Sequence, residues 1–373
     1  MILVFWLAAA LVAYTYVGYA IWLRFRLLWR SRPVLRGPVT PTVSVVMVVR
    51  NEEQILESKL RNLLSLDYPE GQLQIVVVSD GSTDRTQQIL HEFARDARVH
   101  VILNQLPKGK AGGLDDAFEI AHGEIVVFTD ARQKIDTSAM RLLAENFADP
   151  EVGCASGELM LGDPERGESG QGYGLYWRIE KQIRLLESAS GSVVGATGAL
   201  YAARRELLTH VPVGTILDDV YLPMEIVRQG KRVIFDERAI AWDTPDLGAE
   251  REFSRKVRTL SGNYQLMQFA PWLLRRENPI RFEFISHKLL RLAVPVALAA
   301  LLLVAPLLKS PFYKVIFLAQ VIFYALSLIS LARLAKRGIL ARAADAAGTF
   351  VLLNTAALVA LANFVSGKRA AWR

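Results

Sequence analysis

The chain has 373 residues, of which 52% are hydrophobic, and it carries a formal net charge of +7. A basic balance indicates nucleic acid or anionic lipid as a partner, and because much of the charge flanks apolar segments without a nucleic-acid motif, it favours a membrane surface. The single cysteine, Cys154, excludes an intrachain disulfide, and the five histidines lack the spacing of zinc ligands.

The first apolar segment, residues 1–23, contains no charged side chain. At about 1.5 Å per residue, a helix of this length crosses a hydrocarbon core of roughly 30 Å. We predict a spanning helix and not a cleaved signal peptide, because no basic segment precedes the run and no cleavage pattern follows it. Five arginines come next, before any acidic residue: Arg24, Arg26, Arg30, Arg32 and Arg36. The positive-inside rule places this flank in the cytoplasm and the N-terminus outside.

The region from residue 37 to residue 287 has the size of one large α/β domain. Near-continuous apolar runs are typical of parallel strands covered on both faces, and they predict strands at 43–49, 75–78, 99–103 and 125–128. Apolar residues at helical spacing predict connecting helices at 52–65, 83–94 and 111–121. Repeated strand, helix and strand units imply right-handed crossovers and therefore a parallel sheet.

Polar side chains follow three of these strands. Arg50, Asp80 and Asp130 stand at carboxyl ends, where parallel α/β sheets bind their ligands. Asp84 is instead predicted to cap a helix or form a turn. The glycine-rich segment 107–113 adds flexible backbone and two cations, but it is not a P-loop, because no Ser or Thr follows its last lysine.

Three further apolar runs predict three more spanning helices, at 289–308, 315–332 and 348–365. The loop between the last two carries four cations, which the positive-inside rule places in the cytoplasm: Arg333, Lys336, Arg337 and Arg342. Lys309 and Lys314 resist this count, because it puts them on the outer side. Before these runs, aromatic residues interleaved with arginines over 272–284 predict an interfacial amphipathic helix.

These patterns predict an α/β fold with a mostly parallel sheet and α-helical transmembrane segments, one N-terminal and about three C-terminal. They divide the chain into a transmembrane helix with its basic flank, a central α/β domain, interfacial helices and C-terminal transmembrane helices, at 1–36, 37–266, 267–288 and 289–373. We expect a multi-pass protein of the cell (inner) membrane with its α/β domain in the cytoplasm, the lipid bilayer as a partner and no nucleic acid.

Seven segments, taken in order, resemble the membrane-embedded family 2 glycosyltransferases, the group that contains cellulose and hyaluronan synthases. The segments are VSVVMVVRNEE, VVVSDGSTDRT, PKGKAGGLDDA, VVFTDAR, GATGALYAARRE, LDDVYLPMEIVRQGKRVIF and RKVRTLSGN. The likeness covers about residues 43–265. It implies a Rossmann-like GT-A domain, and the flanking apolar segments match the plan of that group.

The resemblance also implies a donor site for a nucleotide-diphosphate sugar. Val49, Arg50 and Glu52 match the loop that frames the base and ribose, and Asp80 matches the aspartate that contacts the base. Lys110 falls where a basic residue lies near the nucleotide.

Asp130 opens the element that in this family reads Asp-x-Asp and holds a divalent cation with the diphosphate, but Arg132 stands at its third position. Either Asp130 still binds the metal with help from diphosphate oxygens, or Arg132 partly replaces the cation. We expect a retained Mg²⁺ or Mn²⁺, because Mg²⁺ is commonly held by one or two carboxylates plus phosphates and water.

Asp219 matches the family's catalytic base, and Asp218 precedes it where glutamate is usual. Paired acids also suit the first turn of a helix, so we assign capping to Asp218 and catalysis to Asp219. Arg255 and Arg258 match the spacing of the family's Gln-x-x-Arg-Trp element and are expected to hold the diphosphate. The alternative for these arginines is a basic interfacial helix.

Four residues belong to the region that approaches the acceptor in relatives: Trp177, Thr197, Gly198 and Thr259. Trp177 lies in an apolar helical pattern, where aromatic residues more often pack than bind sugar. Thr259 replaces a tryptophan that stacks on the acceptor sugar in the family's processive members, so its identity speaks against a long-chain polymerase.

The sequence thus predicts an inverting hexosyltransferase that moves a sugar, from a UDP-sugar as first expectation, to a growing polysaccharide. Single-sugar transfer to a polyprenyl-linked saccharide competes with it, since four spans are few for a sugar channel. A hypothesis of another class is a catalytically inactive nucleotide-binding membrane scaffold, motivated by Arg132. The sequence leaves the oligomeric state open.

Overall fold

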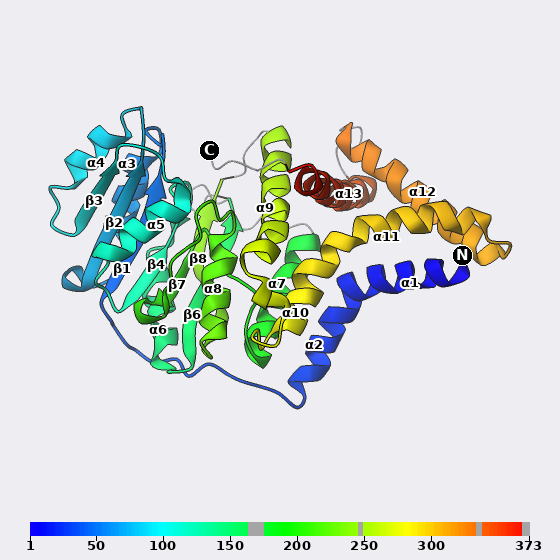
Figure 1. Ribbon diagram of the computed structural model, residues 1–373, viewed down its shortest axis with the longest axis horizontal. Helices are drawn as coiled ribbons and strands as arrows, with labels where there is room; N and C mark the ends of the chain where they lie inside the picture. Colours follow the sequence, from blue (N-terminus) through cyan, green and yellow to red (C-terminus); the bar gives the residue numbers. More distant parts are fainter. Residues whose placement is uncertain (163–174, 245–248, 333–337, 368–373) are drawn as a thin grey trace.

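The computed structural model describes residues 1–162, 175–244, 249–332 and 338–367. A sheet domain stands beside a lobe of long helices (Figure 1). Three cations of the predicted cytoplasmic loop lie outside the described ranges: Arg333, Lys336 and Arg337.

Within these ranges, eight strands form one sheet with the order β3-β2-β1-β4-β7-β6-β8-β5. The strands are β1 (Val43–Val49), β2 (Leu73–Asp80), β3 (Val99–Asn104), β4 (Ile125–Phe128), β5 (Lys134–Ile135), β6 (Val152–Leu161), β7 (Tyr201–Arg204) and β8 (Arg232–Asp243). Strands β1 to β4 are parallel, β7 runs antiparallel to both of its neighbours, β6 pairs in parallel with β8, and β5 runs antiparallel to β8. The predicted α/β fold with a mostly parallel sheet is confirmed, and the four predicted strands are β1 to β4.

The helices of this domain lie on both faces of the sheet. They are α3 (Leu56–Leu64), α4 (Thr86–Phe93), α5 (Gly109–Ile120), α6 (Ala139–Glu145), α7 (Leu175–Ser190), α8 (Asp218–Arg228) and α9 (Ala249–Phe269), with short 3₁₀ turns η2 (Glu70–Gln72), η3 (Asn146–Ala148), η5 (Arg205–Leu207) and η6 (Pro271–Leu274). Successive residues of a strand face opposite sides, so Val45 of β1 packs in the layer of Leu60 from α3, and Val46 packs in the layer of Leu114 from α5.

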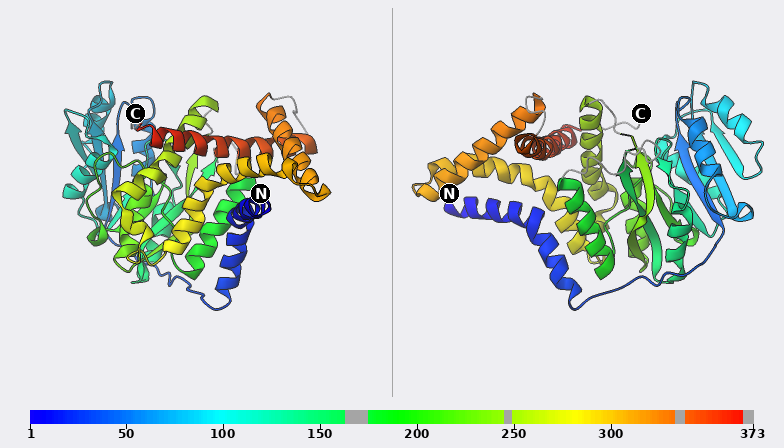
Figure 2. Two further views of the ribbon diagram at one scale, coloured as in Figure 1. Left: turned by 45° about the vertical axis from the view of Figure 1, so that its right-hand side comes forward. Right: turned by 180° about the vertical axis from the view of Figure 1, so that it is seen from behind.

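Four helices among the described residues are long and apolar enough to cross a membrane, as predicted. The first, Ile2–Leu27, joins α1 (Ile2–Ala13), a π-helical turn η1 (Tyr14–Gly18) and α2 (Tyr19–Leu27). The second, Arg281–Leu307, joins α10 (Arg281–Phe284), η7 (Ile285–Leu289), α11 (Leu290–Val304) and η8 (Ala305–Leu307). The others are α12 (Pro311–Leu331) and α13 (Ile339–Val365), which cross the lobe in different directions (Figure 2).

The interfacial helix predicted over 272–284 is wrong as one element. The structure has the 3₁₀ turn η6 there and then α10, which continues directly into the second span. Asn278 ends the first piece, since its side chain bonds the carbonyl of Leu273 and its own Oδ1 accepts from the amide of Ile280. The span therefore begins at Arg281, well before its apolar run, because helical hydrogen bonds do not require apolar side chains.

Buried polar contacts join the first two spans to α7. Tyr19 donates its hydroxyl to Glu187 Oε1 at 2.7 Å. His287 contacts Glu187 and Glu180 through its two ring nitrogens, each at 2.9 Å. Arg291 Nη1 lies 2.9 Å from Glu180 Oε2. One face of α7 is thus bonded to the membrane lobe, beside which it lies in Figure 1.

Candidate active site

Three carboxylates gather where β4 ends and α8 begins. Asp130 comes shortly after β4, and Asp218 and Asp219 are the first two residues of α8. Gly198 lies between the two groups: a Cβ placed on it would stand 3.3 Å from Asp219 Oδ2 and 3.6 Å from Asp130 Oδ2. Its amide donates to Asp219 Oδ2 at 3.1 Å. Acids that are far apart in the sequence therefore border one small space, which a side chain at position 198 would fill.

Lys110, in the first turn of α5, bridges the acids. Its Nζ lies 2.9 Å from Asp130 Oδ1 and 3.2 Å from Asp218 Oδ2. Burial opposes the positive charge, but Asp130 and Asp218 outweigh burial and raise the pKa of Lys110. One lysine among three carboxylates leaves an excess of negative charge, so an anionic diphosphate needs a further cation to bind here.

Asp219 has the properties of a general base. Burial, and then the charge of Asp218, raise the pKa of Asp219 to about 6. Burial also raises the pKa of Asp218. A carboxylate whose pKa lies near the working pH accepts and releases protons efficiently. The predicted capping role of Asp218 is wrong, because Leu217 is the N-cap of α8 without a side-chain cap bond, and Asp218 pairs with Lys110 instead.

Asp80 ends β2 but points into the protein. It is 0% exposed, and its two oxygens accept the amides of Lys108 at 2.7 Å and Gly109 at 2.9 Å. These bonds hold the start of α5, from which Lys110 reaches the acids. Asp84 accepts the amide of Thr86 at 3.0 Å, which confirms its predicted role as a turn former.

The residues of the predicted base and ribose loop follow β1. Val49 is buried in the sheet, whereas Arg50 and Glu52 are partly exposed at its carboxyl end. Burial, and then the nearby charge of Asp130, raise the pKa of Glu52. Glu52 therefore lies close enough to Asp130 for the two charges to interact.

Arg132 pairs with Asp243 at the end of β8, and Gln133 Nε2 lies 3.2 Å from the same carboxylate. Asp243 thus neutralises much of the charge of Arg132, which weakens the hypothesis that Arg132 replaces a metal ion. The described residues contain no group of three or more His, Cys, Asp or Glu side chains placed to hold a metal ion. Asp130, whose side chain is 44% exposed and whose Oδ1 alone faces Lys110, fits a cation that takes its other ligands from phosphate and water.

Arg255 and Arg258 lie on α9 and are partly exposed, and Thr259 is exposed. Neither guanidinium makes a hydrogen bond or ion pair with another residue in the described ranges. Lys256, between them, lies over the ring of Trp177 at 5.2 Å from its centroid. The structure therefore brings α9 to the acceptor region and leaves both arginines without a protein partner in the ranges described.

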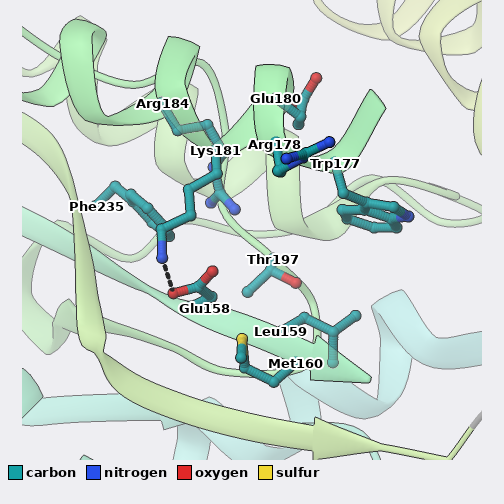
Figure 3. A pocket seen from close by; sticks show the side chains of 10 residues that line it. All are labelled: Glu158, Leu159, Met160, Trp177, Arg178, Glu180, Lys181, Arg184, Thr197 and Phe235. Carbon is teal, nitrogen blue, oxygen red and sulfur yellow. Dashed lines mark hydrogen bonds and ion pairs between the residues drawn. The ribbon is translucent and has the colours of Figure 1, made fainter. Parts of the chain in front are cut away.

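Trp177 and Thr197 line a cavity of ≈ 440 Å³ (Figure 3). The cavity lies between the end of β6 and α7. Thr197 precedes Gly198, so the wall of the cavity adjoins the residue that separates Asp130 from Asp219. Three of the four predicted acceptor residues thus lie together.

Comparison with known proteins identifies the domain that carries these residues. Residues 44–211 match the model of glycosyl transferase family 2. The chain carries a family 2 glycosyltransferase domain. Asp218 and Asp219 lie beyond the matched residues, on the helix that follows them.

The names of the curated relatives of the glycosyltransferase domain describe different products. The poly-beta-1,6-N-acetyl-D-glucosamine synthase of Staphylococcus epidermidis is 23% identical over 62% of this chain and 56% of that protein. The beta-monoglucosyldiacylglycerol synthase of Nostoc is 31% identical over 30% of this chain and 25% of that protein. The chain spans little more than half the length of the first of these relatives, and the two names describe a polysaccharide product and a glycolipid product.

A solved structure confirms the fold, including the helices around the glycosyltransferase domain. A mannosyltransferase from Pyrobaculum calidifontis, solved in complex with GDP-Man and Mn2+, matches with a TM-score of 0.74 and 24% identity over 98% of this chain and 99% of that chain. The predicted GT-A plan with one N-terminal and three C-terminal apolar helices is therefore correct.

Lys59, in α3, escaped the sequence-based prediction. It is 2% exposed and donates to Thr129 Oγ1 at 2.8 Å and to the carbonyl of Gln133 at 2.6 Å. Burial lowers the pKa of Lys59 to about 7. These two bonds connect Lys59 to both ends of the turn that carries Asp130. A cation on the apolar face of the predicted helix was the signal, since Leu60 and Leu63 share that face.

Proposed function

We propose that the protein is an inverting glycosyltransferase that moves a sugar from a nucleotide-diphosphate sugar to an acceptor at the cytoplasmic face of the membrane. The observation that carries this proposal is the cluster in which Lys110 bridges Asp130 and Asp218 while Asp219 faces the same small space. The match of residues 44–211 to the family 2 model supports the same activity.

Asp219 is the proposed base. An acceptor hydroxyl attacks the anomeric carbon, its proton passes to the carboxylate of Asp219, and the bond from that carbon to the diphosphate oxygen breaks with its electron pair on the diphosphate. Attack from the side opposite to the leaving group inverts the anomeric centre. A Mg²⁺ or Mn²⁺ ion held by Asp130 would stabilise the charge of the diphosphate. Lys110 positions Asp130 and Asp218 and neutralises part of the charge of the acids.

The donor side of the proposal uses the ends of β1, β2 and β4. Val49, Arg50 and Glu52 are proposed to frame the nucleoside, and Asp80 to shape that pocket through the loop it holds. Arg255 and Arg258 are proposed to bind the diphosphate once a donor is present, because their guanidinium groups have no ion-pair partner in the described ranges.

The membrane placement is also a proposal. Trp22 and Trp29, at the end of the first span, contact each other with ring centroids 5.9 Å apart, and Trp22 contacts Phe282 at the same distance. Aromatic residues at a span end next to arginines are typical of the cytoplasmic membrane interface. We keep the division at residues 36, 266 and 288, with the glycosyltransferase domain in the cytoplasm, a bilayer partner and a location in the inner membrane.

Two acceptors are supported by different observations. A growing polysaccharide is favoured by the likeness to a poly-N-acetylglucosamine synthase. A lipid-linked acceptor is favoured by Thr259, which stands where a polymerase would have a sugar-stacking ring, and by the likeness to a synthase of a glucosyl lipid.

The test is turnover by the full chain purified in detergent, with a panel of donors, metals and acceptors. Glycosyl transfer that Asp219→Asn abolishes supports the proposal, and product length separates the acceptors: a ladder indicates a polymer, and one discrete addition indicates the lipid route. A protein that binds nucleotide but never turns over, and whose Asp219→Asn variant behaves as the wild type, is a scaffold and contradicts it.

A further inference from the structure

The cavity beside Asp219 is lined by several charged side chains. Its lining includes three cations from α7, namely Arg178, Lys181 and Arg184, and two acids, Glu158 and Glu180. Lys181 Nζ pairs with Glu158 Oε2 and with Glu237 Oε2, each at 2.9 Å, and Figure 3 shows the first of these pairs. Glu180 pairs with His287 and Arg291 of the second span. Arg178 and Arg184 are therefore the lining cations without an ion-pair partner among the described residues.

Arg184 is a guanidinium with unused donors. Among the described residues it makes one hydrogen bond, from Nη2 to Ser156 Oγ at 2.6 Å, although the group has five N–H donors. Its charged end lies over the ring of Phe235 at 4.4 Å from the centroid. Burial lowers the pKa of Arg184 although the charges of four carboxylates oppose that shift, and within the described residues none of the four forms an ion pair with its guanidinium: Glu180, Glu187, Asp219 and Glu158.

Arg178 is the second arginine that lines the cavity. It is exposed, and it makes no hydrogen bond or ion pair with any residue of the described ranges. It lies on α7 between Trp177 and Glu180 and lines the same cavity (Figure 3). Two guanidinium groups that share a cavity and lack carboxylate partners are arranged as in sites that bind phosphate.

The cavity connects the base to the membrane lobe. Ser156 Oγ, which accepts from Arg184, also accepts the amide of Thr197 at 3.0 Å, and the next residue, Gly198, bonds Asp219. Glu180, which also lines the cavity, bonds His287 in the second span. Hydrogen bonds therefore link the cavity to Asp219 through Thr197 and Gly198, and to the second span through Glu180.

We propose that this cavity binds the phosphate of a lipid-linked acceptor, with Arg178 and Arg184 as its ligands. The inference rests on the proposed function and deepens it, because it names the acceptor as a saccharide joined through phosphate to a membrane lipid. The phosphate is held and does not react, while a hydroxyl of the saccharide faces Asp219. The cavity volume of ≈ 440 Å³ is within the range of small-molecule sites.

The experiment measures binding to the full chain in detergent by titration calorimetry, with farnesyl phosphate, farnesol and glucose 1-phosphate as probes. We expect farnesyl phosphate to bind at least about tenfold more tightly than either other probe, because only it supplies both phosphate and lipid. Arg178→Gln and Arg184→Gln should each weaken it by about tenfold or more, as loss of a charge-assisted hydrogen bond does. The matched control is Arg61→Gln on α3, whose side chain is 70% exposed and which lies far from α7 in sequence.

Equal binding of farnesyl phosphate and farnesol would overturn the proposal. Unchanged binding of farnesyl phosphate to Arg178→Gln would overturn it too, because Arg178 is exposed and its substitution leaves the core intact. If glucose 1-phosphate binds as tightly as farnesyl phosphate, the site binds soluble sugar phosphates, and the proposal that its ligand is linked to a lipid is overturned. Donor turnover is followed in the same preparations. If turnover depends on Asp219 while farnesyl phosphate does not bind, only this inference fails; if no donor is turned over, the proposed function fails as well.

Discussion

Replacing Lys110 by methionine tests how the carboxylate cluster works. The substitution keeps the length of the side chain and removes the charge that lies 2.9 Å from Asp130 and 3.2 Å from Asp218. Lys110 also lowers the pKa of Asp219, against the effects of burial and of Asp218 that raise it to about 6. Without the lysine, the pKa of Asp219 rises further.

The sign of the pH effect follows from the role of Asp219. A general base must be deprotonated, so kcat/KM falls as the pH drops below the pKa of that base. A nearby opposite charge shifts a carboxyl pKa by about 1 to 3 units, and because Lys110 contacts Asp218 rather than Asp219, we take the lower end, about one unit. The acid limb of Lys110→Met should therefore lie about one pH unit above that of the wild type.

The assay is kcat/KM of the full chain between about pH 5 and about pH 9 at saturating metal. The matched control is Lys108→Met, whose Nζ pairs with Asp116 at 2.7 Å and whose side chain is 52% exposed. Its acid limb should stay at the wild-type position. If Lys110→Met loses activity equally at every pH, with no movement of the limb, Lys110 acts on the substrate alone and the electrostatic reasoning is refuted.

The remaining predictions concern the base, the metal, the buried lysine and the spans. Asp219→Asn should lower single-turnover transfer by about 10²-fold or more without loss of nucleotide binding, measured by equilibrium titration. Chelation by EDTA should abolish transfer, with recovery on adding Mg²⁺ or Mn²⁺, and Asp130→Asn should raise the metal concentration needed for half-maximal rate. Lys59→Met should lose stability relative to the wild type as pH rises from about 7, measured by thermal unfolding, because the depressed pKa of Lys59 lets the folded protein release that proton before the unfolded chain does. Glu283→Met should cost about 3–5 kcal/mol in a denaturant titration, since it leaves Arg26 buried and unpaired, and Arg26→Met combined with it should restore most of that loss.

The sequence predicted the strands that contain long apolar runs, although β1 and β2 also bury Ser44 and Gln74, and it missed strands in which buried charged residues interrupt the apolar run. β1 to β4 are near-continuous runs of valine, isoleucine and leucine in their buried parts. β6 and β8 instead bury Ser156, Glu158, Asp236 and Asp243. Their partners come from distant segments, such as Lys181 for Glu158, so the local pattern contains no sign that these polar residues belong to buried strands.

The candidate site was predictable where strand topology decides it. Asp130 follows a parallel strand, and such strands end at one edge of the sheet, so its place at the ligand edge followed from the pattern. The position of Asp219 depends on how α8 packs beside Gly198, which periodicity does not encode. The orientation of Asp80, which turns inward to hold Lys108 and Gly109, depends on a loop that only the folded structure shows closing over it.

α7 links the proposed chemistry to the membrane lobe because its side chains bond to both. Arg184, Lys181 and Glu180 line the cavity beside Asp219, and Glu180 and Glu187 also bond groups from the spans. Buried hydrogen bonds fix direction as well as distance, so α7 is held at a set position relative to the spans. Asp219, the proposed base, is linked to α7 through Ser156, Thr197 and Gly198, and this arrangement agrees with the proposed membrane-bound acceptor.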